Sequence, residues 1–397
     1  MLRSINIAVA VCLVGASTSA FAACPANNRF ELNFATAGAQ QLDYATSYTA
    51  TVTNPRGQSQ TMGLAFSTFN LASNQFSGQT MPQISNIVND GGTTNNNLVI
   101  AGVLAGRTTD VSANSRVVVV RFTFATPIRD FTVQVNDIDF TTNQFRDWIQ
   151  INGINGASSF DPVITTPHGN NNASGGQRSA TNSTLLLGPS STPFAVTVRQ
   201  AVGTSVNPNN ANGGTITAEF AAPVTEVQVR YGNFPFTAGE TATGQQAIGI
   251  QSVSFCPMPQ VTMTKSSMPQ SSVATDPNRF NIPNSDVVYA VTVSNSDTSP
   301  VDLNALVLTD VLPPAITFRN SDFDDGGPII TNFEFVPGTT GLSMNSADIA
   351  FSNNGGSSYG YAPTAGYDAA INAIRLNPKG QMAANSSFTV RFRARIK

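Results

Sequence analysis

The stretch RVVVVRFTFATPIRDFTVQVNDIDFTTNQFRDW, residues 116–148, decides the fold. Its first half is apolar on both faces when it is read with the two-residue period of a β-strand, which predicts a central strand of a sheet. Pro127 lacks a backbone donor and is predicted to end this strand. A second strand follows, in which apolar residues alternate with Thr132, Gln134 and Asn136.

Two carboxylates follow the second strand. Phe131, Val133 and Val135 form its apolar face, and the same alternation places Asp137 and Asp139 on that face. Desolvation and mutual repulsion would raise the pKa values of both side chains unless a cation neutralised them. The sequence therefore predicts that a neighbouring group offsets the cost of this pair.

A calcium site is the first candidate for that group. Asp147 follows a loop over residues 141–146 that is long enough to turn the chain back toward the pair. The three carboxylates of Asp137, Asp139 and Asp147, with nearby amide and carbonyl oxygens, suit Ca²⁺, whereas Mg²⁺ demands stricter geometry. We therefore predict Ca²⁺ as a cofactor at these three residues.

Two alternatives to calcium stay open. In the first, the guanidinium of Arg129 or Arg146 pairs with the acids. In the second, the strand ends at Asn136, and Asp137 and Asp139 are solvated turn residues.

The strand-proline-strand pattern occurs a second time at residues 216–236, ITAEFAAPVTEVQVRYGNFPF. Apolar residues recur around Pro223 at the spacing found around Pro127, which predicts two topologically similar strand pairs in one sandwich. Chance recurrence of a common pattern is the alternative. Residues 232–233 stand where the first copy has Asp137, so only one acidic site is predicted.

The N-terminus has the pattern of an export signal. Residues 1–22 place Arg3 before an apolar run and end in Ala20-Phe21-Ala22, which predicts a secretory signal peptide and a mature chain that begins at Ala23. The apolar run is too short to cross a bilayer, and no transmembrane segment is predicted in the mature chain. The expected location is therefore extracellular, on the cell surface or periplasmic.

Composition indicates the fold class. Charged residues make up 11% of the chain, against roughly a quarter in an ordinary soluble domain. No window of the mature chain sustains apolar residues at helical spacing, so an all-β fold is predicted. The formal net charge is −3, and without a basic cluster the chain is not expected to bind nucleic acid.

Cysteine usage predicts one disulfide and a domain boundary. Cys12 lies in the predicted signal peptide, which leaves Cys24 and Cys256 as an even pair in an oxidising compartment. A bridge between them would join the two ends of one domain, residues 23–257. A redox pair or metal-bound thiolates are the alternatives.

The first domain is predicted to be a jelly-roll-like β-sandwich, because about eleven short strand candidates alternate with polar turns. Two of its loops, residues 89–97 and 167–184, are too polar to pack a core. They are either mobile tips or rims that face a ligand.

The second domain, residues 258–397, contains VVYAVTVSNSDTSPVDLNALVLTDVLPPAITF, residues 287–318. This run resembles the bacterial surface-protein repeat domain of unknown function called DUF11, with its Y-x-I-x-V-x-N-x-G strand followed by V-x-V-x-D-x-L-P. Ser296 and Asp297 stand where the repeat usually has a glycine. The tail FTVRFRARI, residues 388–396, is similar to the closing strand of that family. The resemblance implies an immunoglobulin-like β-sandwich on exported envelope proteins, and it implies no activity.

Motifs for catalysis are scarce. The single histidine, His168, lies in an Asn-rich loop without a nucleophile motif or a metal-binding spacing around it. The chain is therefore predicted not to be an enzyme, but an exported bacterial protein with a structural, adhesive or binding role. Its expected partner is a cell-surface glycan or another envelope protein. The alternatives are a calcium-dependent carbohydrate-binding module and a carbohydrate-active enzyme on a jelly-roll scaffold.

Overall fold

The computed structural model describes residues 24–91, 95–168, 177–179, 183–186, 193–236, 240–270, 282–295, 299–324 and 332–397. These residues form antiparallel strands and short 3-10 turns, with no α-helix among them, which confirms the all-β prediction. Two compact units are present, one holding Ala23–Met258 and the other Pro259–Lys397. In the described ranges, no helix is long and apolar enough to cross a membrane.

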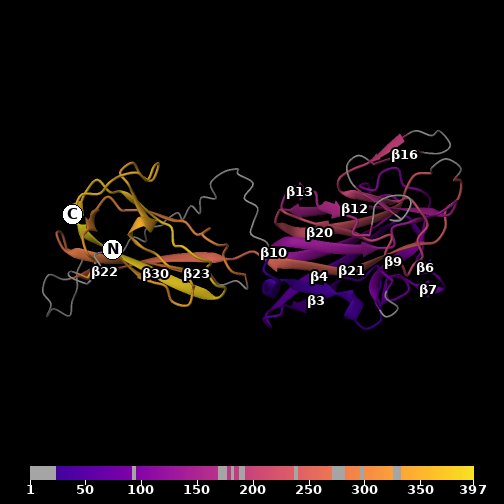
Figure 1. Cartoon of the computed structure of the whole chain (residues 1–397), viewed down its shortest axis with the longest axis horizontal. Coiled ribbons are helices and arrows are strands. Elements are labelled where there is room, and N and C mark those ends of the chain that lie inside the picture. Colours follow the sequence, from indigo (N-terminus) through magenta and orange to yellow (C-terminus); the bar gives the residue numbers. More distant parts are fainter. Residues whose placement is uncertain are drawn as a thin grey trace. The chain divides into compact units, whose positions relative to one another are not determined.

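The elements of the first unit follow one another along the chain and are drawn in Figure 1. They are η1 (Ala26–Asn28), β1 (Phe30–Asn33), η2 (Phe34–Thr36), β2 (Gln40–Gln41), β3 (Tyr48–Thr53), β4 (Ser59–Phe69), β5 (Leu71–Ser73), β6 (Gln75–Phe76), β7 (Gln79–Thr80), β8 (Gln83–Ser85), β9 (Asn97–Leu104), β10 (Val117–Asn136), β11 (Phe140–Thr141), β12 (Phe145–Asn155), β13 (Ser158–Phe160), β14 (Val163–Thr165), β15 (Gln177–Ser179), β16 (Ser183–Leu186), β17 (Pro193–Val196), β18 (Gln200–Gly203), β19 (Ile216–Glu219), β20 (Val224–Asn233) and β21 (Gln246–Pro257).

Strand β10 organises the first unit. The predicted break at Pro127 is wrong, because β10 runs without interruption from Val117 to Asn136. Its first half pairs with β4 and β20, and its second half pairs with β21 and β19. The register shifts between Thr123 and Ile128, so Pro127 lies where the strand exchanges its neighbours and needs no ladder donor.

The two halves of β10 face each other across one core. Phe131 of the second half lies 6.1 Å from Phe122 and 5.9 Å from Phe124 of the first half, measured between ring centroids. Phe220, which directly follows β19, and Phe255 of β21 belong to the same buried cluster. A strand that serves both layers around a shared apolar core gives a β-sandwich.

The two copies of the strand-proline-strand pattern pair with each other. Val118 of the first copy lies opposite Tyr231 of the second, and Val133 lies opposite Ala218. The first strand of each copy therefore pairs with the second strand of the other. This antiparallel exchange places the copies as similar strand pairs within one sandwich.

The predicted disulfide between Cys24 and Cys256 is confirmed. The Cα atoms of the two residues are 6.1 Å apart, within the usual range for a bridge. Strand β1 pairs with the end of β21, where Phe30 lies opposite Phe255 and stacks on it at 5.7 Å. The bridge thus links segments that the sheet already holds side by side.

The second unit contains a larger and a smaller sheet. The larger sheet has the order β22-β23-β30-β25-β28 with β26 also paired to β30, and the smaller one has the order β24-β29-β27. The elements are β22 (Val261–Gln270), β23 (Asp286–Asn295), β24 (Leu308–Val311), β25 (Ile316–Asn320), β26 (Phe333–Val336), η3 (Ser346–Asp348), β27 (Ile349–Ser352), β28 (Gly366–Asp368), β29 (Ala373–Leu376) and β30 (Ser386–Ile396).

Both sheets of the second unit contribute to its core. Phe318 of the larger sheet lies 5.4 Å from Phe351 of the smaller one. On β30, Phe388, Val390 and Phe392 are buried while the alternating Arg residues point away from the core. The packing is that of a second β-sandwich.

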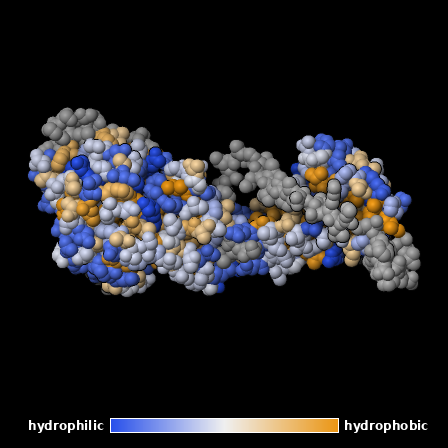
Figure 2. All heavy atoms as spheres, turned by 180° about the vertical axis from the view of Figure 1, so that it is seen from behind, coloured by the Kyte–Doolittle hydropathy of each residue, from blue (hydrophilic) through white to orange (hydrophobic). Residues whose placement is uncertain are grey.

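The two polar loops predicted at residues 89–97 and 167–184 are only partly described by the structure. Asn89 and Asn97 are buried, and the Asn97 side chain donates to the carbonyl of Val88 at 2.6 Å, so the first loop is anchored where it is described. Residues 92–94 and most of 167–184 lie outside the described residues, as do residues 1–22. On the face seen in Figure 2, apolar atoms of the first unit form small separate spots among polar ones.

Candidate functional site

The candidate site begins where β10 ends. The chain leaves the strand after Asn136, and Asp137 has a φ of +65°. Asp137 and Asp139 therefore lie in the connection between β10 and β11, and the prediction that they continue the apolar strand face is wrong. A left-handed residue cannot keep the alternation of an extended strand, and Asp tolerates this conformation better than most residues.

The structure places the three predicted acidic residues near one another in the interior of the first unit. Strand β11 folds back on the start of β12, with Phe140 opposite Arg146, so Asp139 and Asp147 become neighbours. The backbone amide of Asp139 donates to Oδ2 of Asp147 at 3.2 Å, and the amide of Asp147 donates to the carbonyl of Asp139 at 2.9 Å. Asp137, Asp139 and Asp147 are 3%, 4% and 0% exposed. The alternative is therefore right that the strand ends at Asn136 and wrong that Asp137 and Asp139 are solvated.

Two residues that the sequence reasoning missed hold these acids. The backbone amide of Asn207 donates to Oδ2 of Asp139 at 2.8 Å, and its side chain donates to Oδ1 of Asp137 at 3.3 Å. The hydroxyl of Tyr231 donates to Oδ1 of Asp147 at 2.6 Å. Tyr231 sits at the end of β20 on the core side, which its alternation indicated, but nothing in sequence pointed to Asn207.

Burial dominates the ionisation of the cluster. It raises the pKa of Asp139 to about 7. Burial, and then the charge of Asp139, raise the pKa of Asp137 and of Asp147 well above the ordinary value for a carboxyl group. All three carboxyl groups are therefore harder to ionise in the folded chain than in water, because their charged forms lose hydration.

Gly203, at the end of β18, and Gly214, in the connection before β19, pack closely against the backbone of the cluster. A Cβ atom on Gly203 would lie 1.8 Å from the carbonyl oxygen of Asp139, and one on Gly214 would lie 2.6 Å from the amide nitrogen of Ile138. The amide of Ile138 also donates to the carbonyl of Gly214 at 3.0 Å. Glycine at both positions is what permits this close approach.

Gly203→Ala should therefore disrupt the site. We expect the free energy of unfolding of the first unit to fall by about 3 kcal/mol or more, because the added methyl group meets backbone atoms that cannot rotate away. Urea denaturation measures the change. Gly38→Ala is the matched control, since a Cβ there has no neighbour within 4 Å. Equal stability of the two variants would contradict the packing described for Gly203.

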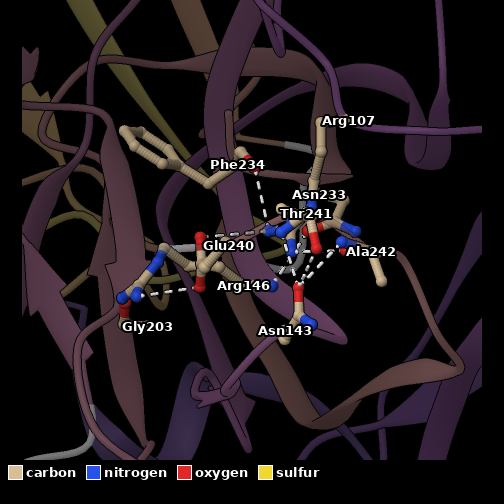
Figure 3. A network of polar contacts seen from close by, with 9 residues as sticks. All are labelled: Arg107, Asn143, Arg146, Gly203, Asn233, Phe234, Glu240, Thr241 and Ala242. Atoms are coloured by element: carbon tan, nitrogen blue, oxygen red, sulfur yellow. Dashed lines mark hydrogen bonds and ion pairs between the residues drawn. The ribbon is translucent and has the colours of Figure 1, made fainter. Parts of the chain in front are cut away.

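A buried ion network is built around Arg146, which directly precedes Asp147 in the chain, and is drawn in Figure 3. Glu240 accepts from Nη2 of Arg146 at 3.2 Å and lies 3.8 Å from Nη1 of Arg107. All three residues are buried. Arg146 also donates to the carbonyl of Gly203 at 2.7 Å, which links this network to the end of β18 that packs against the cluster.

The segment after Glu240 is fastened to the β11–β12 turn. Oδ1 of Asn143 accepts hydrogen bonds from the backbone amides of Thr241 and Ala242, as Figure 3 shows. The guanidinium of Arg107 donates to the carbonyls of Phe234 and Ala242 at 3.2 and 2.9 Å. The buried charges thus tie together loops that are far apart in sequence.

The positions of the three acidic residues do not favour a preformed calcium-binding site. Within the described ranges, no three His, Cys, Asp or Glu side chains are grouped in a way that could hold a metal ion. The carboxylates of Asp139 and Asp147 instead accept from a backbone amide and from the Tyr231 hydroxyl. Arg146 pairs with Glu240. Calcium at Asp137, Asp139 and Asp147 stays a prediction.

Two other residues with possible chemistry are Trp148 and His168. Trp148 is 1% exposed and packs edge-on against Phe194 and Phe234 at 5.1 and 4.8 Å, so it offers no stacking surface to a sugar. His168 is exposed.

Comparison with known proteins adds no relative. No protein-family model matches the chain, and no curated protein matches it. The resemblance of residues 287–318 to DUF11 stays a prediction.

Proposed function

We propose that the chain is an exported protein of the bacterial envelope or extracellular space, with a structural, adhesive or binding role. The observation that carries this proposal is the Cys24–Cys256 bridge, which spans 232 residues and is buried at both ends. Such bridges persist in oxidising compartments and are rare in the cytosol. The pattern of residues 1–22 and the DUF11-like run at 287–318 support the same location.

Burial of the acidic cluster supports a role without catalysis. A carbohydrate-active enzyme needs two carboxylates that reach the scissile bond and a water molecule. Asp137, Asp139 and Asp147 are at most 4% exposed, and their oxygens bind groups of the protein itself. The cluster fixes the loops at one end of the sandwich.

Cell fractionation tests the proposed location. We expect the full chain, expressed in a bacterium, to be found in the periplasm, on the surface or in the medium, with its N-terminus at Ala23. Cys24 and Cys256 should resist alkylation until a reductant is added, because the bridge forms after export.

The control is the same chain without residues 2–22, which should stay in the cytosol with both thiols open to alkylation. The proposal is wrong if the intact chain remains in the cytosol with both thiols free.

A further inference from the structure

A polar depression of about 350 Å³ lies on the first unit, on the side of β12 that faces away from the core. Ile149 and Ile151 point into the core, so the alternating Gln150 and Asn152 point to the opposite face and form part of the floor of the depression. The volume is at the lower end of the range for small-molecule sites.

Strand pairing arranges the floor as a grid of polar side chains. Gln150 lies between Gln200 of β18 and Arg230 of β20, and Asn152 lies opposite Gln228 of β20. Neighbouring strands are about 4.8 Å apart, and the two rows are separated by about 7 Å along the strands. Amide groups at these intervals offer several hydrogen-bond donors and acceptors to one polar ligand.

The amide of Gln150 has unused hydrogen-bonding capacity. Gln150 is only 5% exposed and lines the depression, yet its side chain bonds to none of the described residues. The nitrogen and oxygen of this amide are not among the fully buried, unpaired polar atoms of the described residues, so water reaches them in the free protein and a ligand that both donates and accepts could replace that water. The Asn152 amide, at the same floor, is likewise without a partner among the described residues.

The guanidinium groups of the depression already have hydrogen-bond or ion-pair partners in the protein. Arg230 donates to the carbonyls of Val111 and Ala113 at 2.9 Å each, so its guanidinium is not available to an anion. Arg199, at the rim, pairs with Asp161 at 3.1 Å. These contacts favour an uncharged ligand over an acidic one.

We propose that this depression binds a neutral saccharide through hydrogen bonds between its amide side chains and the hydroxyl groups of the sugar. An amide offers a donor and an acceptor in one plane, which suits adjacent hydroxyl groups. The proposal rests on the proposed function, since a protein of the cell exterior meets glycans, and it names the ligand class and the residues that hold it.

The test uses the full chain and a panel of neutral and acidic oligosaccharides, with affinities measured by calorimetry. We expect binding to one or more neutral oligosaccharides. Gln150→Met keeps the length of the side chain but removes the amide, and it should weaken that binding at least about tenfold. The control is Gln144→Met, an exposed amide in the β11–β12 turn, which should bind as the wild type does.

Fluorescence of Trp148 checks that each variant is folded, and Asn152→Leu replaces Gln150→Met if the latter does not fold. The inference fails if no neutral oligosaccharide binds, if only acidic ones bind, or if the amide variants bind as tightly as the wild type. An exported chain with a closed disulfide that binds no sugar would overturn this inference alone. A cytosolic chain would overturn the proposed function.

Discussion

Replacing Cys24 and Cys256 with Ala should lower the free energy of unfolding of the first unit by up to about 5 kcal/mol. The bridge closes a loop of 232 residues, and a cross-link over so long a loop removes much of the conformational entropy of the unfolded chain. Native contacts change little, because β1 and β21 are also held by their ladder and by the Phe30–Phe255 stack.

Urea denaturation followed by the fluorescence of Trp148 measures this effect. Trp148 is the only tryptophan of the chain and is buried in the first unit, so its emission reports on that unit alone. The dependence of the unfolding free energy on urea should also steepen, since an unbridged chain exposes more surface when it unfolds.

The wild type treated with reductant is the matched control, and its stability should fall to that of the double variant. If oxidised and reduced wild-type chains unfold at the same urea concentration, the bridge does not stabilise the unit.

The sequence was sufficient for features that depend on local pattern or on counting. The alternation of residues 117–124 predicted a central strand, and Val117, Val118, Val119 and Val120 are all buried. An even number of cysteines in the predicted mature chain indicated the disulfide. These inferences succeed because strand burial follows a two-residue period and because two thiols can pair in only one way.

Features that depend on long-range packing were not predictable in this way. Pro127 lacks a backbone donor, and its own backbone alone therefore predicts a strand end. The strand continues because β10 exchanges one set of paired strands for another at that point. Asp137 reads as a strand residue until its positive φ is known. Asn207 lies 68 residues from Asp139, and no local pattern in sequence connects the two.

The approach of Asp147 to Asp139 was predicted, and the backbone amide of Asp139 donates to Oδ2 of Asp147. The loop between these two residues is short, so the reversal at β11–β12 is a local event. The hydrogen bonds that stabilise the carboxylates of Asp139 and Asp147, from Asn207 and Tyr231, were not predictable, because they form only in the folded sandwich.

The stability of the first unit should fall as the pH rises from about 4 to about 7. The folded state raises the pKa of Asp139 from 3.8 to about 7, so in this range the folded chain holds a proton that the unfolded chain has released. The free energy of unfolding then decreases by about 1.4 kcal/mol per pH unit for this group. The raised pKa values of Asp137 and Asp147 act in the same direction.

Urea denaturation at a series of pH values between 4.5 and 7.5, followed by Trp148 fluorescence, measures this dependence. A chelator is present throughout, so that no cation neutralises the carboxylates. Asp139→Asn should flatten the profile, because its amide does not titrate and its oxygen still accepts the hydrogen bond from the backbone amide of Asn207. Asp43→Asn removes an exposed carboxylate and should leave the slope unchanged. A wild-type unit that becomes steadily more stable toward pH 7.5, or an Asp139→Asn variant that keeps the wild-type slope, would show that the buried acid does not control the stability of this fold.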